Sequence, residues 1–155
     1  RDIPGKVDVV CDAKALPFDK GSFDRIYARH VLEHWGHRET PEVLREWHRV
    51  LKSGGVLELH CPDLDKIIQS YLDEVFDLYT EQTFDNPLLC HYLYGSQEYP
   101  ADTHKAGWNF SALGRLLEEA EFRDIERRKL QLLADQSLGK PEHGSAPVPP
   151  AAGGL

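Results

Sequence analysis

Histidine and acidic side chains that could bind a metal are concentrated between residues 30 and 37. His30-Val31-Leu32-Glu33-His34 matches the H-x-x-E-H zinc motif of inverted metallopeptidases, and His37 follows closely. Two imidazoles and a carboxylate can hold zinc for hydrolysis, but that motif requires one continuous helix to bring both imidazoles to the same face. Here the motif directly follows strand-like residues and meets Gly36 within one turn. We therefore expect no metal site, and a zinc hydrolase remains a remote alternative.

Two further groups of candidate residues lie directly after short apolar runs. Asp12 and Ala13 follow the β-branched run 7–11, and Arg29 and His30 follow the run 23–28. Such runs are typical of buried strands. In open α/β sheets, ligands bind outside the carboxyl ends of the strands, so we expect these turns to border one crevice.

The rest of the pattern supplies the elements that position these turns. We predict strands at 7–11, 23–28, 56–61 and 122–130, and helices at 40–53, 64–76 and 110–120. Thr40, before Pro41, is expected to accept a backbone N–H bond at the first helix start, and Asn109 is expected to cap the last helix. Gly54 and Gly55 are expected to end the first helix. Alternating strands and helices indicate the α/β class.

The segment 83–108 is aromatic and rich in Pro and Gly, and we predict a loop-rich insertion with about one short helix. Its aromatic residues, Tyr92, Tyr94, Tyr99 and Trp108, suit either a lid over an acceptor or a small additional core. We take residues 1–135 as one partial domain. Residues 136–155, rich in Gly, Pro and Ala, are predicted to be disordered.

Composition restricts the function class. The 155 residues carry a net charge of −8, which argues against nucleic acid as a partner. No apolar run is long enough for membrane insertion, and three widely spaced cysteines favour a cytoplasmic protein without disulfides. The chain has no Met and begins at Arg1, so we expect the natural chain to start further upstream.

Four short pieces occur in a fixed order, and together they carry a family resemblance. They are Asp12-Ala13 with Leu16-Pro17-Phe18, then Ser22-Phe23-Asp24, then the His30–His34 piece, and then Arg49-Val50-Leu51-Lys52-Ser53-Gly54-Gly55. In this order the chain resembles class I S-adenosylmethionine-dependent methyltransferases. It is most similar to a group of small predicted methyltransferases that share Pro62-Asp63-Leu64, with the likeness covering about residues 6–130.

The resemblance implies a Rossmann-like three-layer fold with helices on both faces of the sheet, here without its front strands. It implies S-adenosylmethionine as cofactor, with Asp12 accepting from the adenine amino group and Ala13 and Leu16 beside the ring. Ala28, Arg29 and His30 would lie under the methionine part. The glycine-rich turn that binds this end of the cofactor is not present before Val7, and the chain has no G-x-G-x-x-G spacing.

Simpler roles stay open for these residues. Asp12 could cap a turn, Arg29 could be a surface charge, and His30 could be structural. For a hydroxyl acceptor, His30 or His104 would be the catalytic base. The acceptor is expected to be a small molecule or a glycan.

Two consequences of the missing front strands also stay open. One is a non-catalytic methyltransferase-like interaction module. The other is a homodimer formed through the sheet edge that the missing strands leave exposed.

Overall fold

The computed structural model describes residues 8–77, 82–83 and 85–128. The predicted disordered tail 136–155 and Val7, the first residue of the first predicted strand, lie outside these residues. Within the described part, strands and helices follow one another along the chain, as the pattern predicts for an α/β protein.

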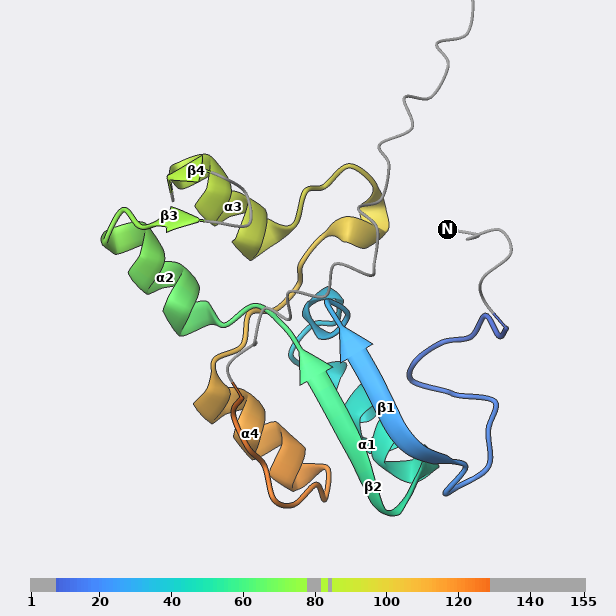
Figure 1. Ribbon diagram of the computed structural model, residues 1–155. Coiled ribbons are helices and arrows are strands. Elements are labelled where there is room, and N and C mark those ends of the chain that lie inside the picture. The colour runs from blue at the N-terminus through green and yellow to red at the C-terminus, as the bar shows by residue number, and fades with distance from the viewer. Residues whose placement is uncertain (1–7, 78–81, 84, 129–155) are drawn as a thin grey trace, which may run out of the picture.

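A two-stranded parallel sheet forms the centre of the molecule (Figure 1). Strand β1 (Phe23–Arg29) pairs with β2 (Leu51–His60), and Ala28 lies opposite Leu59. Side chains alternate between the two faces of a strand, so one face of this sheet carries mostly apolar residues. Ile26, Ala28, Leu57 and Leu59 of this face pack in the main core.

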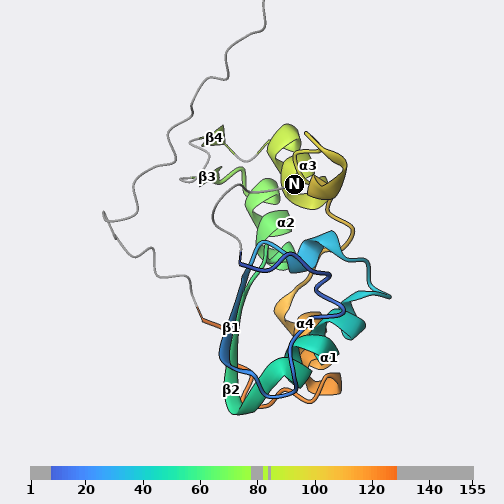
Figure 2. The ribbon, with the colours of Figure 1, turned by 90° about the vertical axis from the view of Figure 1, so that its right-hand side faces the viewer.

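The main core lies between this sheet face and two helices. Helix α1 (Thr40–Val50) buries Val43, Leu44 and Trp47 at helical spacing. Helix α4 (Phe110–Glu119) packs beside α1, and Asn109 caps it as predicted, with Oδ1 accepting from Ala112 N at 2.8 Å. Figure 2 shows both helices on the same side of the sheet. The α/β architecture is therefore confirmed, and the described residues supply two of its three layers.

A second, smaller core lies beyond the carboxyl ends of the strands. Helix α2 (Leu64–Leu72) begins at Asp63, whose side chain accepts from Asp65 N, and it ends before the predicted residue 76. A short antiparallel pair, β3 (Phe76–Asp77) with β4 (Gln82–Thr83), follows α2. Helix α3 (Asn86–Tyr94) is the short helix predicted within 83–108. Ile67 and Leu88 join α2 to α3, with Tyr92 packed against them.

The predicted strand at 7–11 is wrong over its described residues. Residues 8–11 have no strand structure and are exposed, with Val10 84% exposed. A strand requires a neighbour for its backbone hydrogen bonds, and among the described residues β1 pairs only with β2. The predicted strand at 122–130 fails over 122–128 as well, and residues 129–130 lie outside the described part.

Two predicted helix boundaries need correction. Thr40 is inside α1, and its hydroxyl donates to Gly36 O at 3.1 Å instead of accepting a backbone N–H bond. Helix α1 ends at Val50, so Gly54 and Gly55 lie in an irregular part of β2. Gly54 has a φ of +77°, and a Cβ at Gly55 would lie only 2.9 Å from the Lys52 carbonyl oxygen. The two glycines therefore permit the irregular backbone in the first part of β2.

Candidate functional site

The carboxyl end of β1 presents His30 to the surface. Its backbone is left-handed, with a φ of +49°, and its N–H donates to His60 O at 2.9 Å. This uncommon backbone conformation turns the chain away from the sheet directly after the strand. The imidazole is 56% exposed, and its Nδ1 lies 3.4 Å from Oε1 of Glu33. His30 therefore borders the site from the solvent side.

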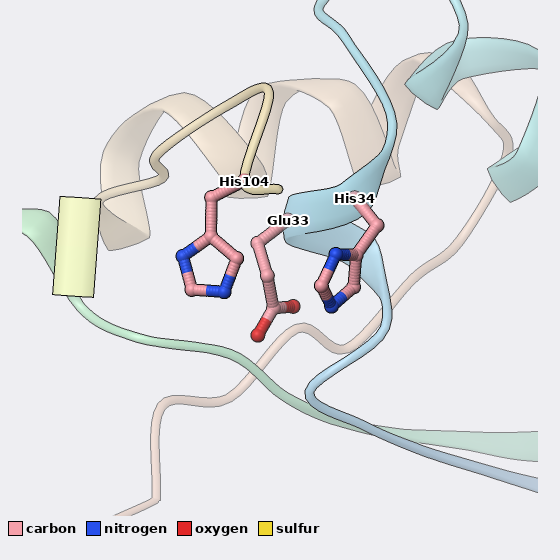
Figure 3. A group of neighbouring side chains, drawn as sticks. All are labelled: Glu33, His34 and His104. Atoms are coloured by element: carbon pink, nitrogen blue, oxygen red, sulfur yellow. The ribbon is translucent and has the colours of Figure 1, made fainter. Parts of the chain in front are cut away.

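Glu33 is the most buried charged residue in this part of the molecule. It lies in a three-residue 3-10 turn, η1 (Leu32–His34), and its side chain is 3% exposed. Neither carboxylate oxygen accepts a hydrogen bond from any of the described residues. Figure 3 shows the rings of His34 and His104 on either side of this carboxylate. One ring nitrogen of each and one carboxylate oxygen lie within 4.8 Å of one another.

Backbone hydrogen bonds hold the segment around His104 against η1. The N–H groups of Lys105 and Ala106 both donate to the Glu33 carbonyl oxygen, at 2.8 and 3.2 Å. The Nδ1 atom of His104 lies 2.8 Å from Tyr92 O, and Nδ1 of His34 lies 3.3 Å from Thr103 O. These contacts fix both imidazole rings beside the acid.

The turn after residue 11 is organised by Asp12 itself. Its Oδ1 accepts from Lys14 N at 2.9 Å and its carbonyl oxygen accepts from Ala15 N at 3.0 Å. This is the turn-capping role that the sequence left open for Asp12. Its predicted contact with adenine stays a prediction.

An ion pair on α1 fixes the loop that follows this turn. Arg49 donates to the carbonyl oxygens of Leu16 and Phe18 at 3.1 and 2.9 Å, and it bonds to both carboxylate oxygens of Glu46 at 2.7 Å. Glu46 in turn accepts from Leu16 N at 2.7 Å. The hydrogen bond from Arg49, supported by that from Leu16 N, holds the pKa of Glu46 below its usual value.

An open groove of about 320 Å³ lies between this loop and β1. Its lining includes residues from both faces of β1, so the groove runs along the strand edge. The lining residues are Leu16, Phe18, Phe23, Arg25, Ile26, Tyr27, Ala28, Val31, Trp47 and Val50. Of the predicted cofactor residues, Leu16 and Ala28 are therefore brought together.

The other predicted site residues fall into two places. Asp12 and Ala13 share the turn before the groove, with Ala13 partly buried against the main core. His30 and His104, the predicted catalytic bases, both border Glu33, and Arg29 is exposed beside His30. The short η1 confirms that the His30–His34 motif has no continuous helix. His104 takes the place beside Glu33 and His34 that the zinc motif gives to His30.

Sequence reasoning missed the separate importance of Glu33 and Glu46. In the sequence, Glu33 was notable only as part of the zinc motif, and its burial was not predicted. An acid directly after Leu32, a residue of core character, was the signal that could have indicated this burial. Glu46 carried no distinguishing signal, because an acid three residues before an arginine is common on helix surfaces.

The buried thiol of Cys61 lies close to the same acid. Burial, with a smaller contribution from the charges of Glu33 and Asp63, raises the pKa of Cys61 to about 12. Cys61 therefore stays a neutral thiol at neutral pH. The three cysteines are all free.

The described residues fit one part of S-adenosylmethionine. The apolar groove along β1 offers a surface for an adenine ring, and the turn at Asp12 offers a carboxylate acceptor. The sequence has no G-x-G-x-x-G spacing for the methionine end.

Comparisons with known proteins find similarity to methyltransferases. Residues 3–59 match the family model described as a methyltransferase domain. Methyltransferase GfsG of Streptomyces halstedii is 33% identical over 110 residues, which cover 71% of this chain and 37% of that protein. Demethylmenaquinone methyltransferase of Staphylococcus epidermidis is 31% identical over 142 residues, covering 87% of this chain and 55% of that protein. This chain thus spans about a third to a half of these relatives.

Among solved structures, the chain is similar to a methyltransferase crystal structure from Bacillus halodurans. The sequences are 24% identical, the TM-score is 0.41, and the match covers 71% of this chain and 42% of that one. No helix within the described residues is long and apolar enough to cross a membrane.

Proposed function

We propose, from the match of residues 3–59 to the methyltransferase domain model, that this chain is part of an S-adenosylmethionine-dependent methyltransferase. The acceptor is a small molecule or a glycan, and the relative named for demethylmenaquinone favours the small molecule. The observation that carries the proposal is the groove along β1, which brings Leu16 and Ala28 together.

In this reaction the bound cofactor supplies an activated methyl group on a sulfonium. The protein mainly aligns the two reactants and excludes water. Leu16 and Ala28 provide an apolar wall, and a hydrogen bond from Arg49 to the Leu16 carbonyl oxygen fixes the loop that carries Leu16. Asp12, held in its turn, would accept from the adenine amino group of the bound cofactor, and the Ala13 N–H would contact the ring. Pre-positioning of this kind lowers the entropic cost of alignment.

His30 is proposed as the base that takes the proton from a hydroxyl acceptor. Its imidazole is exposed and stands beside the buried Glu33 carboxylate, so an acceptor can approach the ring from solvent. His104 is the alternative base, but its Nδ1 is engaged by Tyr92 O and the ring lies deeper. The geometry therefore favours His30.

Calorimetric titration with S-adenosylmethionine and with its demethylated product tests the proposal. The titration is made with this chain and with a version extended upstream. Binding by either supports the methyltransferase, and binding by the extended version alone places the cofactor site partly in the front strands. Binding by neither favours the alternative, a non-catalytic interaction module.

The variant His30→Ala tests the role of the base. Turnover by the extended protein is expected to fall by about 100-fold, while cofactor binding changes little, because a general base acts only in the chemical step. His48→Ala is the matched control, because this partly exposed imidazole on α1 lies against Glu121 and Phe122 and is not part of the proposed site. Equal losses of turnover and binding in His30→Ala would refute the role.

We also propose that β1 of this chain pairs with a second copy of itself. Among the described residues β1 has one strand neighbour, and the groove leaves its other edge open. An unpaired edge favours strand pairing. Light scattering is expected to show a dimer of this chain, and a monomer at all concentrations would contradict it.

The three free cysteines support a reducing compartment, and the proposed location is the cytoplasm. This part of the proposal is tested by fractionation of cells that make the tagged protein.

A further inference from the structure

We propose that Glu33, His34 and His104 form a binding site for a divalent transition metal, zinc above all. The site joins the segment after β1 to the segment before Ala106, and it differs from the H-x-x-E-H motif in using His104 in place of His30. It departs from our expectation of no metal. The inference concerns metal binding alone and does not depend on methyl transfer.

The first observation is the state of the Glu33 carboxylate. Its side chain is 3% exposed, and both oxygens lack a hydrogen-bond donor among the described residues. Burial of a carboxylate without such partners is costly, so buried charges are normally paired or bind a metal. The Nδ1 atom of His30 lies 3.4 Å from Oε1, and that ring is mostly in solvent. The carboxylate therefore lies between the rings of His34 and His104 without a donor, and a cation there would offset its charge (Figure 3).

The second observation is the orientation of the two flanking imidazoles. The Nδ1 atoms of His34 and His104 both lie beside backbone carbonyl oxygens, those of Thr103 and Tyr92. A carbonyl oxygen only accepts, so a proton on each Nδ1 leaves Nε2 as the ring atom available to a ligand. Metal-binding histidines commonly donate their second nitrogen to a carbonyl in this way.

The third observation is that backbone contacts prepare the site. Lys105 N and Ala106 N both bond to the carbonyl oxygen of Glu33 itself, so His104 is brought next to the acid independently of any ligand. The three donor atoms lie within 4.8 Å of one another. Ligands about 2 Å from a tetrahedral zinc stand about 3.3 Å apart, so closure requires each pair to approach by at most about 1.5 Å. Small rotations of the three side chains would bring the donor atoms to this separation.

The donor set selects the class of metal. Two imidazole nitrogens with one carboxylate oxygen suit zinc and related transition metals, whereas calcium and magnesium prefer oxygen ligands alone. Three protein ligands leave one position for water or another ligand, as in zinc sites that are not fully closed by protein. Cys61 lies near Glu33, but its thiol is buried and its donor atom is not part of the group.

The test is zinc binding by the full chain after its metals have been removed with a chelator. Calorimetry with zinc alone is expected to show one bound equivalent, and zinc is expected to raise the Tm, because a ligand that binds only the folded state stabilises it. Calcium added in place of zinc is expected to do neither.

Three variants sharpen the test, and their thermal unfolding without metal establishes that each folds. Glu33→Gln keeps the shape of the side chain and His104→Gln removes one imidazole, and each is expected to weaken zinc binding by at least about tenfold. His48→Gln, on α1 beside Glu121, is the matched control and should bind zinc like the parent chain.

Absence of a one-to-one zinc complex in the parent chain would overturn the proposal. Equal binding by Glu33→Gln and the parent chain would also overturn it. So would a loss in His48→Gln as large as in His104→Gln, since the zinc would then bind surface histidines.

Discussion

One buried and one partly buried acid, thirteen positions apart in sequence, have opposite surroundings. Glu46 is 14% exposed and accepts three hydrogen bonds at 2.7 Å from Arg49 and Leu16. Glu33 is 3% exposed and accepts none from the described residues. If stability alone governed both positions, the more deeply buried acid would have more partners. The difference separates an acid that fixes a loop from one that is left available for a ligand.

Removal of the partner of Glu46 is the change with the largest expected effect. Arg49→Ala leaves the carbonyl oxygens of Leu16 and Phe18 without their donor and leaves Glu46 unpaired. We expect the free energy of unfolding to fall by about 1–2 kcal/mol, measured by urea denaturation. Arg49→Lys keeps the charge but loses the paired hydrogen bonds to Glu46. Its free energy of unfolding should therefore lie between those of the parent chain and Arg49→Ala. No loss in Arg49→Ala would remove the contrast between the two acids.

Neutralisation of the two acids should then act in opposite directions. In metal-free protein, Glu33→Gln is expected to leave the free energy of unfolding unchanged or raise it by up to about 1 kcal/mol, because an uncompensated buried charge is removed. Glu46→Gln should lower it, because the pairing with Arg49 is lost. Urea denaturation of both variants, after chelation, gives the comparison directly. A marked destabilisation by Glu33→Gln would show that this carboxylate is already satisfied.

The smallest expected effect is on Cys61, which reports whether Glu33 is charged. The pKa of Cys61 is raised in the folded state from 9.0 to about 12, so folding favours the neutral thiol. The contribution of this shift to the free energy of unfolding is complete below pH 9. Stability is lost as the pH rises from 9 towards 12. Glu33→Gln should lower this pKa by a small amount, because burial is the larger cause.

The rate of Cys61 alkylation against pH, measured in a chain with Cys11→Ser and Cys90→Ser, tests this expectation. The same chain with Glu46→Gln is the control. An identical pH profile with and without the Glu33 substitution would indicate that the Glu33 carboxylate carries no charge there.

Local elements were predictable where the pattern itself determined the structure. The strand-like residue types of 23–28 predicted β1, and the spacing of Val43, Leu44 and Trp47 predicted α1. Asn109 was found as a cap because a side-chain oxygen at a helix start bonds to nearby N–H groups. These features depend on neighbours within a few positions. The segment 8–11 has an equally strong strand pattern, but a strand also requires a partner, which no local pattern supplies.

The site was predictable only in part, for the same reason. The strand-like residues 23–28 indicated His30 correctly as a residue directly after a strand, whereas Asp12 follows residues 8–11, which form no strand. His104 was named as a base, but its place beside Glu33 depends on backbone bonds from Lys105 and Ala106 that span about seventy residues. Neither spacing nor composition reports such a contact. The missing donors of Glu33 are likewise a property of three-dimensional packing.

The bonds from Lys105 and Ala106 to the carbonyl of Glu33 also determine when the cluster can form. They close a loop that contains α1, β2, α2 and α3, so most of the described chain must be in place before they form. Closing a loop of this length costs entropy that only a preformed core can offset. We therefore expect the three-residue cluster to assemble last during folding and to open first in local unfolding. A bound metal would then slow that local opening more than it slows unfolding of the sheet and α1.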